Sequence, residues 1–291
     1  MSDGQRVIIR EAHAKINLCL EIIGRRQDNY HDITSVMQLV GLSDTLTFSA
    51  AETLSLECDH AGLAAEGDSN LVLKAARLLR EASGIQAGAY ITLEKQIPMS
   101  AGLGGGSSDA AAALRGLSEL WGLQPGKDDM LEIAMQLGSD VPFFLGGPTA
   151  LVEGRGERVT RMPSPPAGWA LLVSPRYDLQ DKTRRLYASL TRNDMSEGIV
   201  THQLIAGLIA GQFPPSSLLF NGFERAAGGV FEGLDRVRAA IMRAGGRDVH
   251  LSGSGPTFFS LYTAAEENKA RRVHEVLQGE GMRAYLASLI R

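Results

Sequence analysis

The alternation of apolar and polar residues in the first part of the chain predicts β-strands. Runs rich in Ile, Val and Leu are interrupted by a polar turn at residues 24–29. In the run over residues 14–23, Lys15, Asn17, Cys19 and Glu21 alternate with apolar neighbours. Sheet is therefore expected to dominate this region. The predicted strands cover residues 6–11, 14–23, 33–40 and 45–57.

Helical spacing of apolar residues begins after this region. Asp68, Ser69 and Asn70 are suited to cap a helix over 71–83, and Gly84 is suited to end it. Residues 139–142 are expected to form a short loop. Further helices are expected at about 107–121, 128–138, 182–190, 200–210, 221–244 and 265–280. Further strands are expected at 89–95, 169–174, 247–251 and 257–262, and a pair of strands at 148–160 around the turn at 154–156. Because strands and helices mix in both halves, the predicted class is α+β.

The length of 291 residues favours two domains over one core. Residues 162–168 contain three prolines and a glycine and form the most linker-like stretch of the chain. We therefore predict an N-terminal domain over residues 1–160 and a smaller C-terminal domain over residues 161–291.

Composition and charge exclude several classes of function. Apolar residues make up 44% of the chain and the formal net charge is −4, which gives no basic footprint for nucleic acid or an anionic membrane. No apolar run is long enough to span a membrane, and the first residues lack the features of a signal peptide. Cys19 and Cys58 show neither zinc spacing nor a disulfide framework. These features predict a cytoplasmic protein.

A glycine cluster between residues 98 and 114 is the most informative motif. Gly102, Gly104, Gly105 and Gly106 lead through two serines and Asp109 into a run of strong helix formers. Glycine lets the backbone approach a ligand, and the start of a helix offers unpaired N–H groups to an anion. A phosphate-binding loop is favoured over a merely flexible turn, because a flexible linker would not lead directly into a helix.

The two commonest phosphate motifs do not fit this cluster. It has no Lys before Leu114 for a Walker A loop, and Ser107 and Asp109 occupy positions that a dinucleotide motif reserves for Gly or Ala. The positive charge must then come from elsewhere, and Lys15 is the candidate, although the pattern alone fits an exposed strand lysine better. Asp140 either braces the turn before Val141 or accepts a proton from an attacking hydroxyl.

Two other segments carry weaker signals. Tyr30 and His31 follow a polar turn, where a structural histidine is the more common case. A second glycine cluster at residues 251–257 lies between two strand-like runs. It is either a plain hairpin turn or a nest of backbone N–H groups that closes over the first glycine cluster.

Together these segments resemble the GHMP kinases, a family of small-molecule kinases. The resemblance rests on A-K-I-N-L at 14–18, P-M-S-A-G-L-G-G-G-S-S-D-A-A at 98–111 and S-G-S-G-P-T at 252–257. Three further segments, at 24–31, 138–144 and 152–157, are similar to those family members that act on a cytidine-diphosphate-linked methylerythritol. The motifs follow the order of that group and span nearly the whole chain.

The resemblance implies a fold, a reaction and a set of site residues. The fold would be a two-domain α+β GHMP kinase, with an N-terminal domain of ribosomal-protein-S5-like topology. The reaction would transfer the γ-phosphate of ATP to the 2-hydroxyl of the cytidine-linked sugar alcohol, in the non-mevalonate isoprenoid pathway. Lys15 and Asp140 would be the catalytic pair. The substrate would contact Asn17, Tyr30, His31, Thr183 and Tyr187. The ATP loop would comprise Pro98, Met99, Ser100, Ala101, Gly102, Leu103, Gly104, Gly105, Gly106, Ser107 and Ser108.

Two alternatives and several partner predictions accompany this interpretation. The chain could be another GHMP kinase, of the homoserine or mevalonate type, or a non-catalytic sensor that keeps the fold; Lys15 and Asp140 argue against a sensor, which needs no base. Mg²⁺ is expected with ATP, but no metal ligands can be assigned. We expect only small-molecule partners, no nucleic acid and no membrane, and a monomer or homodimer.

Overall fold

The computed structural model describes residues 6–28, 30–60, 69–177, 179 and 181–291. The chain divides into two compact units: the first comprises Met1–Ala14, Ser43–Met99 and Gly104–Leu145, and the second comprises Lys15–Leu42, Ser100–Leu103 and Gly146–Arg291. Two long strands, β1 (Val7–Arg25) and β2 (His31–Ala51), contribute residues to both. The predicted boundary between residues 160 and 161 falls inside the second unit and stays a prediction.

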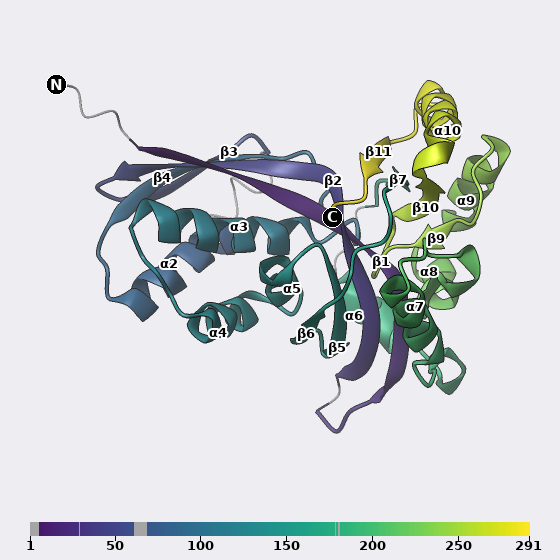
Figure 1. Cartoon of the computed structure of the whole chain (residues 1–291), viewed down its shortest axis with the longest axis horizontal. Coiled ribbons are helices and arrows are strands. Elements are labelled where there is room, and N and C mark those ends of the chain that lie inside the picture. The colour runs from purple at the N-terminus through teal and green to yellow at the C-terminus, as the bar shows by residue number, and fades with distance from the viewer. Residues whose placement is uncertain (1–5, 29, 61–68, 178, 180) are drawn as a thin grey trace. The chain divides into compact units, whose positions relative to one another are not determined.

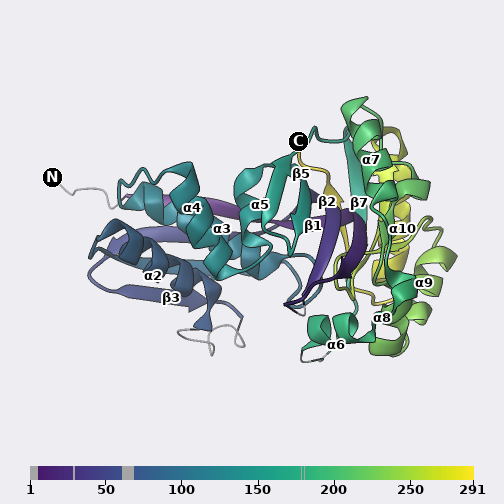
Figure 2. The same ribbon diagram turned by 90° about the horizontal axis from the view of Figure 1, so that it is seen from below.

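In the first unit, helices cover one face of a small sheet. Strand β4 (Gly88–Glu94) pairs antiparallel with residues 45–51 of β2 and parallel with β3 (Leu54–Cys58). A parallel pair needs a crossover connection, and the chain between these two strands contains α2 (Leu71–Ser83). Helices α2, α3 (Gly105–Leu120) and α4 (Lys127–Leu137) gather on one side of β3 and β4 (Figure 1, Figure 2).

Small residues let α3 pack closely in this unit. Ala110 to Ala113 are all buried, and a Cβ atom at Gly116 would overlap the ring of Phe48 on β2. The predicted caps of α2 are confirmed where the structure describes them: Asn70 Oδ1 accepts the N–H of Val72 at 2.9 Å, and Gly84 has φ +70°. Asp68, which was predicted to contribute, lies outside the described residues.

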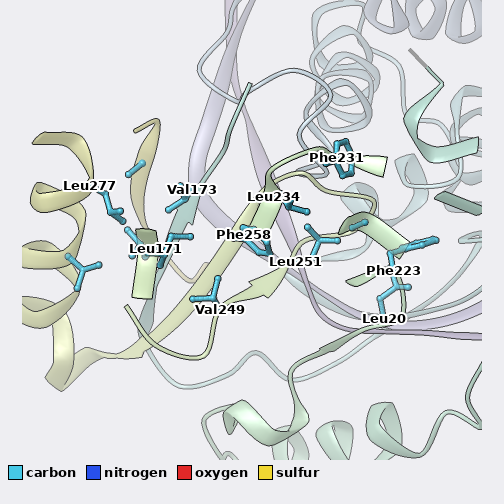
Figure 3. Close-up of a cluster of buried hydrophobic side chains, with 14 of the residues drawn as sticks. Leu20, Leu171, Val173, Phe223, Phe231, Leu234, Val249, Leu251, Phe258 and Leu277 are labelled. Atoms are coloured by element: carbon cyan, nitrogen blue, oxygen red, sulfur yellow. The ribbon is translucent and has the colours of Figure 1, made fainter. Parts of the chain in front are cut away.

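The second unit contains an antiparallel sheet in the order β11 (Ala284–Ser288), β7 (Gly168–Val173), β10 (Phe258–Thr263) and β9 (His250–Leu251). Helix α10 (Glu267–Gly279) packs against this sheet, and Figure 3 shows Leu277 of that helix beside Leu171 and Val173 of β7. The same core includes Phe223, Phe231 and Phe258, and reaches Leu20 of β1.

Other elements of the second unit carry site residues or flank the sheet. Strand β5 (Thr149–Gly154) pairs with residues 33–38 of β2 and with β6 (Arg158–Arg161), and the short β8 (Phe220–Asn221) pairs parallel with Cys19 and Leu20. This unit also contains the helices α6 (Lys182–Ser189), α7 (Ile199–Ile209), α8 (Glu224–Val230) and α9 (Leu234–Arg243).

Several predicted element boundaries were wrong. The strands predicted at 6–11 and 14–23 form one continuous strand, β1. The strand predicted at 33–40 and most of the one at 45–57 form β2, and β3 follows as a separate strand. The loop expected at 139–142 ends at residue 140, because α5 (Val141–Gly146) begins at once. The single helix expected at 221–244 is α8 and α9, divided where Gly233 adopts φ +77°. Strand β11 was not predicted.

Candidate active site

The glycine cluster forms a tight turn that leads into α3. Ser100, Gly102 and Gly104 have φ of +52°, +82° and +72°, and Gly104 is the residue before the first turn of the helix. The helix begins at Gly105, two residues earlier than predicted, and no side chain caps it. Its first N–H groups therefore have no acceptor within the helix, as a phosphate-binding turn requires.

A buried charge triad lies beside the start of α3 in the first unit. The ammonium of Lys95 forms ion pairs with Asp44 and with Asp109, the latter at 2.7 Å. The other oxygen of Asp44 accepts the backbone N–H groups of Gln96 and Ile97 at 2.6 and 2.8 Å. The triad thus fixes the chain immediately before Pro98, where the predicted ATP loop begins.

The triad carries one more negative charge than positive. Burial raises the pKa of Asp109 to about 7, with Lys95 opposing and Asp44 adding to the shift. Burial acts to lower the pKa of Lys95, but the two carboxylates outweigh it and raise that pKa above its ordinary value. The Oδ1 atom of Asp109 is buried without a hydrogen-bond partner, so a proton there offsets the excess charge.

Asp140 also belongs to the first unit and is half-buried at the entrance to α5. The helix start is secured by the backbone, because the N–H of Val141 donates to the carbonyl of Gly138 at 3.2 Å. In the described part of the chain, the carboxylate of Asp140 has neither a hydrogen-bond nor an ion-pair partner. A structural bracing role is therefore not supported by any contact, and the carboxylate is available to a ligand.

In the second unit, Lys15 and Asn17 lie on the same face of β1, as the alternation predicted. Lys15 is only 3% exposed, and its ammonium donates to Asn17 Oδ1 at 2.6 Å and to the carbonyl of Gly102 at 3.0 Å. The amide of Asn17 donates in turn to Ser35 Oγ at 2.7 Å. Lys15 is thus not an exposed strand lysine, and its charge is held against the predicted ATP loop.

The second glycine cluster contacts the first within this unit. Ser252 Oγ donates to the carbonyl of Gly102 at 3.1 Å, and the N–H of Thr257 donates to the carbonyl of Ala101 at 3.2 Å. A Cβ atom at Gly253 would lie 2.9 Å from the ammonium of Lys15. The cluster is therefore both the connection between β9 and β10 and a partner of the residue 100–103 turn.

The predicted substrate residues Tyr30, His31 and Tyr187 lie in the second unit. The rings of His31 and Tyr187 are stacked with centroids 5.0 Å apart and an interplanar angle of 23°, although 156 residues separate them in the chain. Tyr30 is 53% exposed, and the guanidinium of Arg155 lies 3.7 Å from its ring centroid. Burial, aided by the charge of Arg25, lowers the pKa of His31 and so favours the neutral imidazole.

Thr183 and its neighbour Lys182 begin α6. Thr183 Oγ1 lies 3.1 Å from Ser254 Oγ in the second glycine cluster. Lys182 and Thr183 help to line a cavity of about 730 Å³, which Ser100 of the first turn also borders. Thr183 is therefore close to both glycine clusters of this unit.

The sequence interpretation missed four charged residues near these groups: Asp44, Lys95, Arg155 and Lys182. A lysine and a proline three residues later mark the end of β4, but nothing in that spacing reveals the two buried carboxylates around Lys95. Arg155 lies between two glycines of a turn and offers no periodic signal. In the described ranges, no group of three or more His, Cys, Asp or Glu side chains is placed to hold a metal ion.

Comparison with known proteins matches both halves of the chain to one family. The sequence models of the GHMP kinases N terminal domain and the GHMP kinases C terminal region match residues 70–147 and 208–281. A 4-diphosphocytidyl-2-C-methyl-D-erythritol kinase of Dehalococcoides mccartyi is 40% identical over 280 residues, which cover 96% of this chain and 97% of that protein. The chain belongs to the 4-diphosphocytidyl-2-C-methyl-D-erythritol kinases, within the GHMP kinases.

Further relatives agree with this assignment. The kinase of the same name from Pelotomaculum thermopropionicum is 41% identical over 271 residues, or 92% of each chain. A crystal structure of a 4-(cytidine 5′-diphospho)-2C-methyl-D-erythritol kinase superimposes with a TM-score of 0.81 at 35% identity, covering 97% of this chain and 99% of that one. The predicted two-domain α+β GHMP kinase fold is confirmed.

More distant GHMP kinases share the fold alone. A homoserine kinase from Cytophaga hutchinsonii has a TM-score of 0.75 but only 20% identity over the whole of this chain and 96% of that one. Among the described helices, none is long and apolar enough to cross a membrane.

Proposed function

We propose that this chain transfers the γ-phosphoryl group of ATP to the 2-hydroxyl of 4-diphosphocytidyl-2-C-methyl-D-erythritol, a step towards isoprenoid precursors by the non-mevalonate route. The observation that favours this substrate is the stacked pair of His31 and Tyr187. A cytosine ring stacks on aromatic side chains, and a neutral imidazole offers one donor and one acceptor to its edge. Homoserine and mevalonate have no base for such a pair to bind.

We assign the chemical step to Asp140 and Lys15. Asp140 takes the proton of the 2-hydroxyl as that oxygen forms a bond to the γ-phosphorus, while the bond to the β-phosphate oxygen breaks and ADP leaves. Lys15 offsets negative charge on the transferring group. The support for this assignment is that, among the described residues, the Asp140 carboxylate makes no competing contact, and that Lys15 is held by Asn17 and the Gly102 carbonyl.

ATP would place its phosphates on the Pro98 to Ser108 segment, where the positive-φ turn leads into the uncapped start of α3. Magnesium would arrive with ATP, because phosphate oxygens and water supply most of its ligands in such sites and a protein cage is not needed. This fits the absence of a ready-made acidic cluster among the described residues.

We assign the remaining predicted residues to separate parts of the substrate. Tyr30, His31 and Tyr187 would bind the cytidine end, Thr183 the middle of the substrate, and Asn17 the sugar alcohol beside Lys15. Asn17 is 1% exposed and already bonded to Lys15 and Ser35, so its amide oxygen can serve the substrate only while it also orients the lysine. We expect small-molecule partners only, a monomer or homodimer, and a cytoplasmic location.

An assay of ADP release by the purified protein tests this function. The acceptors are 4-diphosphocytidyl-2-C-methyl-D-erythritol, mevalonate and homoserine, each supplied with ATP and Mg²⁺. We expect turnover with the first acceptor and only background ATP hydrolysis with the other two. Turnover with mevalonate or homoserine would make the chain another GHMP kinase, and binding of ATP and the cytidine compound without any turnover would make it a sensor.

A further inference from the structure

Lys182 has contacts that set it apart from the surface lysines of the chain. It is half-buried at the start of α6, and its ammonium donates to Ser254 Oγ at 3.3 Å and to the carbonyl oxygen of Gly255. Both acceptors are neutral and both belong to the second glycine cluster. In the described part of the chain, no carboxylate forms an ion pair with Lys182.

Within the described ranges, the charges that lie near Lys182 are positive or already paired. Burial, and to a smaller extent the positive charge of Lys15 on β1, lowers the pKa of Lys182 to about 8. Asp181 precedes Lys182, but its carboxylate is exposed and pairs with Arg184 at 3.1 Å. Among the described residues the partners of Lys182 are neutral, and a second ammonium nearby adds repulsion that a bound anion would offset.

The two lysines contact one pair of turns. Lys15 donates to Gly102 in the first turn, Lys182 donates to Gly255 in the second, and the Ser252 hydroxyl bonds to the Gly102 carbonyl between them. Ser100 of the first turn and Lys182 also border the same cavity of about 730 Å³. An anion bound beside these turns would therefore lie close to Lys182, with Lys15 behind the first turn.

We propose that Lys182 binds an oxygen of the γ-phosphoryl group of ATP, as a second cation beside Lys15. This inference rests on the proposed function for the identity of the anion, because that reaction brings a terminal phosphate to the residue 100–103 turn. A lysine ammonium is suited to this role, since it acts as a compact point charge that can stay with the phosphoryl group as it moves. The diphosphate of the acceptor is the competing anion.

The experiment compares nucleotides with and without a γ-phosphate. Isothermal titration measures the Kd of ADP and of adenosine 5′-(β,γ-imido)triphosphate, both with Mg²⁺, for the wild type, Lys182→Gln and Lys182→Arg at pH 7. We expect Lys182→Gln to weaken the triphosphate by roughly 10-fold to 100-fold, the usual effect of losing a charged hydrogen bond, and ADP by less than about 2-fold. Lys182→Arg should recover most of the loss.

The pH dependence provides a readout that a merely structural role would not change. Wild-type affinity for the triphosphate should fall as pH rises above about 8, because Lys182 then loses its proton. Lys182→Arg should extend binding to higher pH, since arginine stays charged. If Lys182→Gln does not fold, this comparison carries the test alone, and identical wild-type and Lys182→Arg profiles would overturn the proposal.

A matched control variant separates γ-phosphate binding from a general effect of positive charge in the cavity. Arg184→Gln removes a cation that lines the same cavity but is exposed and paired with Asp181, so it should leave both affinities unchanged. Equal losses for ADP and the triphosphate, or a loss for cytidine 5′-diphosphate instead, would reject γ-phosphate binding. These titrations contain no acceptor, so failure of the proposed substrate in the ADP-release assay would leave their outcome readable.

Discussion

Replacing Asp109 by Asn should remove a pH dependence from the stability of the first unit. Asp109 is buried in the triad with Asp44 and Lys95, and its pKa in the folded protein is about 7 instead of 3.8. A raised carboxyl pKa means that the folded state holds a proton that the unfolded state has released. The resulting stability is complete below about pH 4 and is lost as pH rises through 7.

The size of the effect follows from this shift. Each pKa unit corresponds to about 1.4 kcal/mol, so between pH 5 and pH 8 the wild type should lose roughly 3 kcal/mol of unfolding free energy at this site. Asn has the shape of protonated Asp and can still accept from Lys95, but it does not titrate. The stability advantage of the variant over the wild type should therefore grow by roughly 3 kcal/mol between pH 5 and pH 8.

Urea titrations at pH 5, 6, 7 and 8 measure this difference. The chain has two tryptophans, and Trp121 lies in the first unit, where its indole N–H donates to the Gly88 carbonyl at 3.1 Å. A Trp169→Phe background leaves Trp121 as the fluorescent reporter of that unit. Asp128→Asn, which removes an exposed carboxylate of the same unit, controls for the change in net charge. Parallel stability curves for wild type and Asp109→Asn across this pH range would refute the reasoning.

Three further changes test the triad and the proposed site. Lys95→Met leaves two buried carboxylates without a cation and should lower the unfolding free energy by about 3–5 kcal/mol at pH 7.5; a loss below about 1 kcal/mol in the same urea assay would contradict this. Asp140→Asn should reduce kcat by roughly 10³-fold or more, with Ser139→Ala as the neighbouring control, and near-normal turnover would exclude Asp140 as the base. Tyr187→Leu should raise the KM for the cytidine substrate about 10-fold, because the stacking is lost. Tyr187→Phe keeps an aromatic ring and should keep the wild-type KM, and an effect confined to kcat would argue against base binding.

The sequence predicted best those elements whose start, buried face and end are specified by neighbouring residues. Asn70, the apolar spacing after it and Gly84 specify α2 completely, because cap, face and stop all lie within 15 residues. The division between α8 and α9 was missed because the helical spacing of apolar residues continues across the Gly233 turn. Strand β11 was missed because its partner β7 lies more than 100 residues away, and short strands depend on such pairing.

Of the candidate site, the sequence predicted the glycine loop but not the burial of Lys15. The glycine cluster identified the loop because positive φ values at Gly102 and Gly104 need glycine itself, which is visible in the sequence. The missing Walker lysine made Lys15 a candidate, but its strand pattern fits an exposed lysine, so only the resemblance gave it a catalytic role. That it is buried against Gly102 depends on tertiary packing, which no local pattern encodes.

Lys95 and Lys182 show why the partners of a buried lysine say more about its role than its burial does. Lys95 has two carboxylates within the same unit, so its charge is balanced by the fold and its loss should chiefly cost stability. Among the described residues, Lys182 has a hydroxyl and a carbonyl as partners and Lys15 as its charged neighbour, so none of these residues balances its charge. A fold retains such a cation at a cost, and the cost is offset when a phosphate binds. The two lysines should therefore respond oppositely to substitution: Lys95→Met should reduce stability with or without nucleotide, whereas Lys182→Gln should leave the ligand-free protein as stable as the wild type or more so, and weaken only the triphosphate complex.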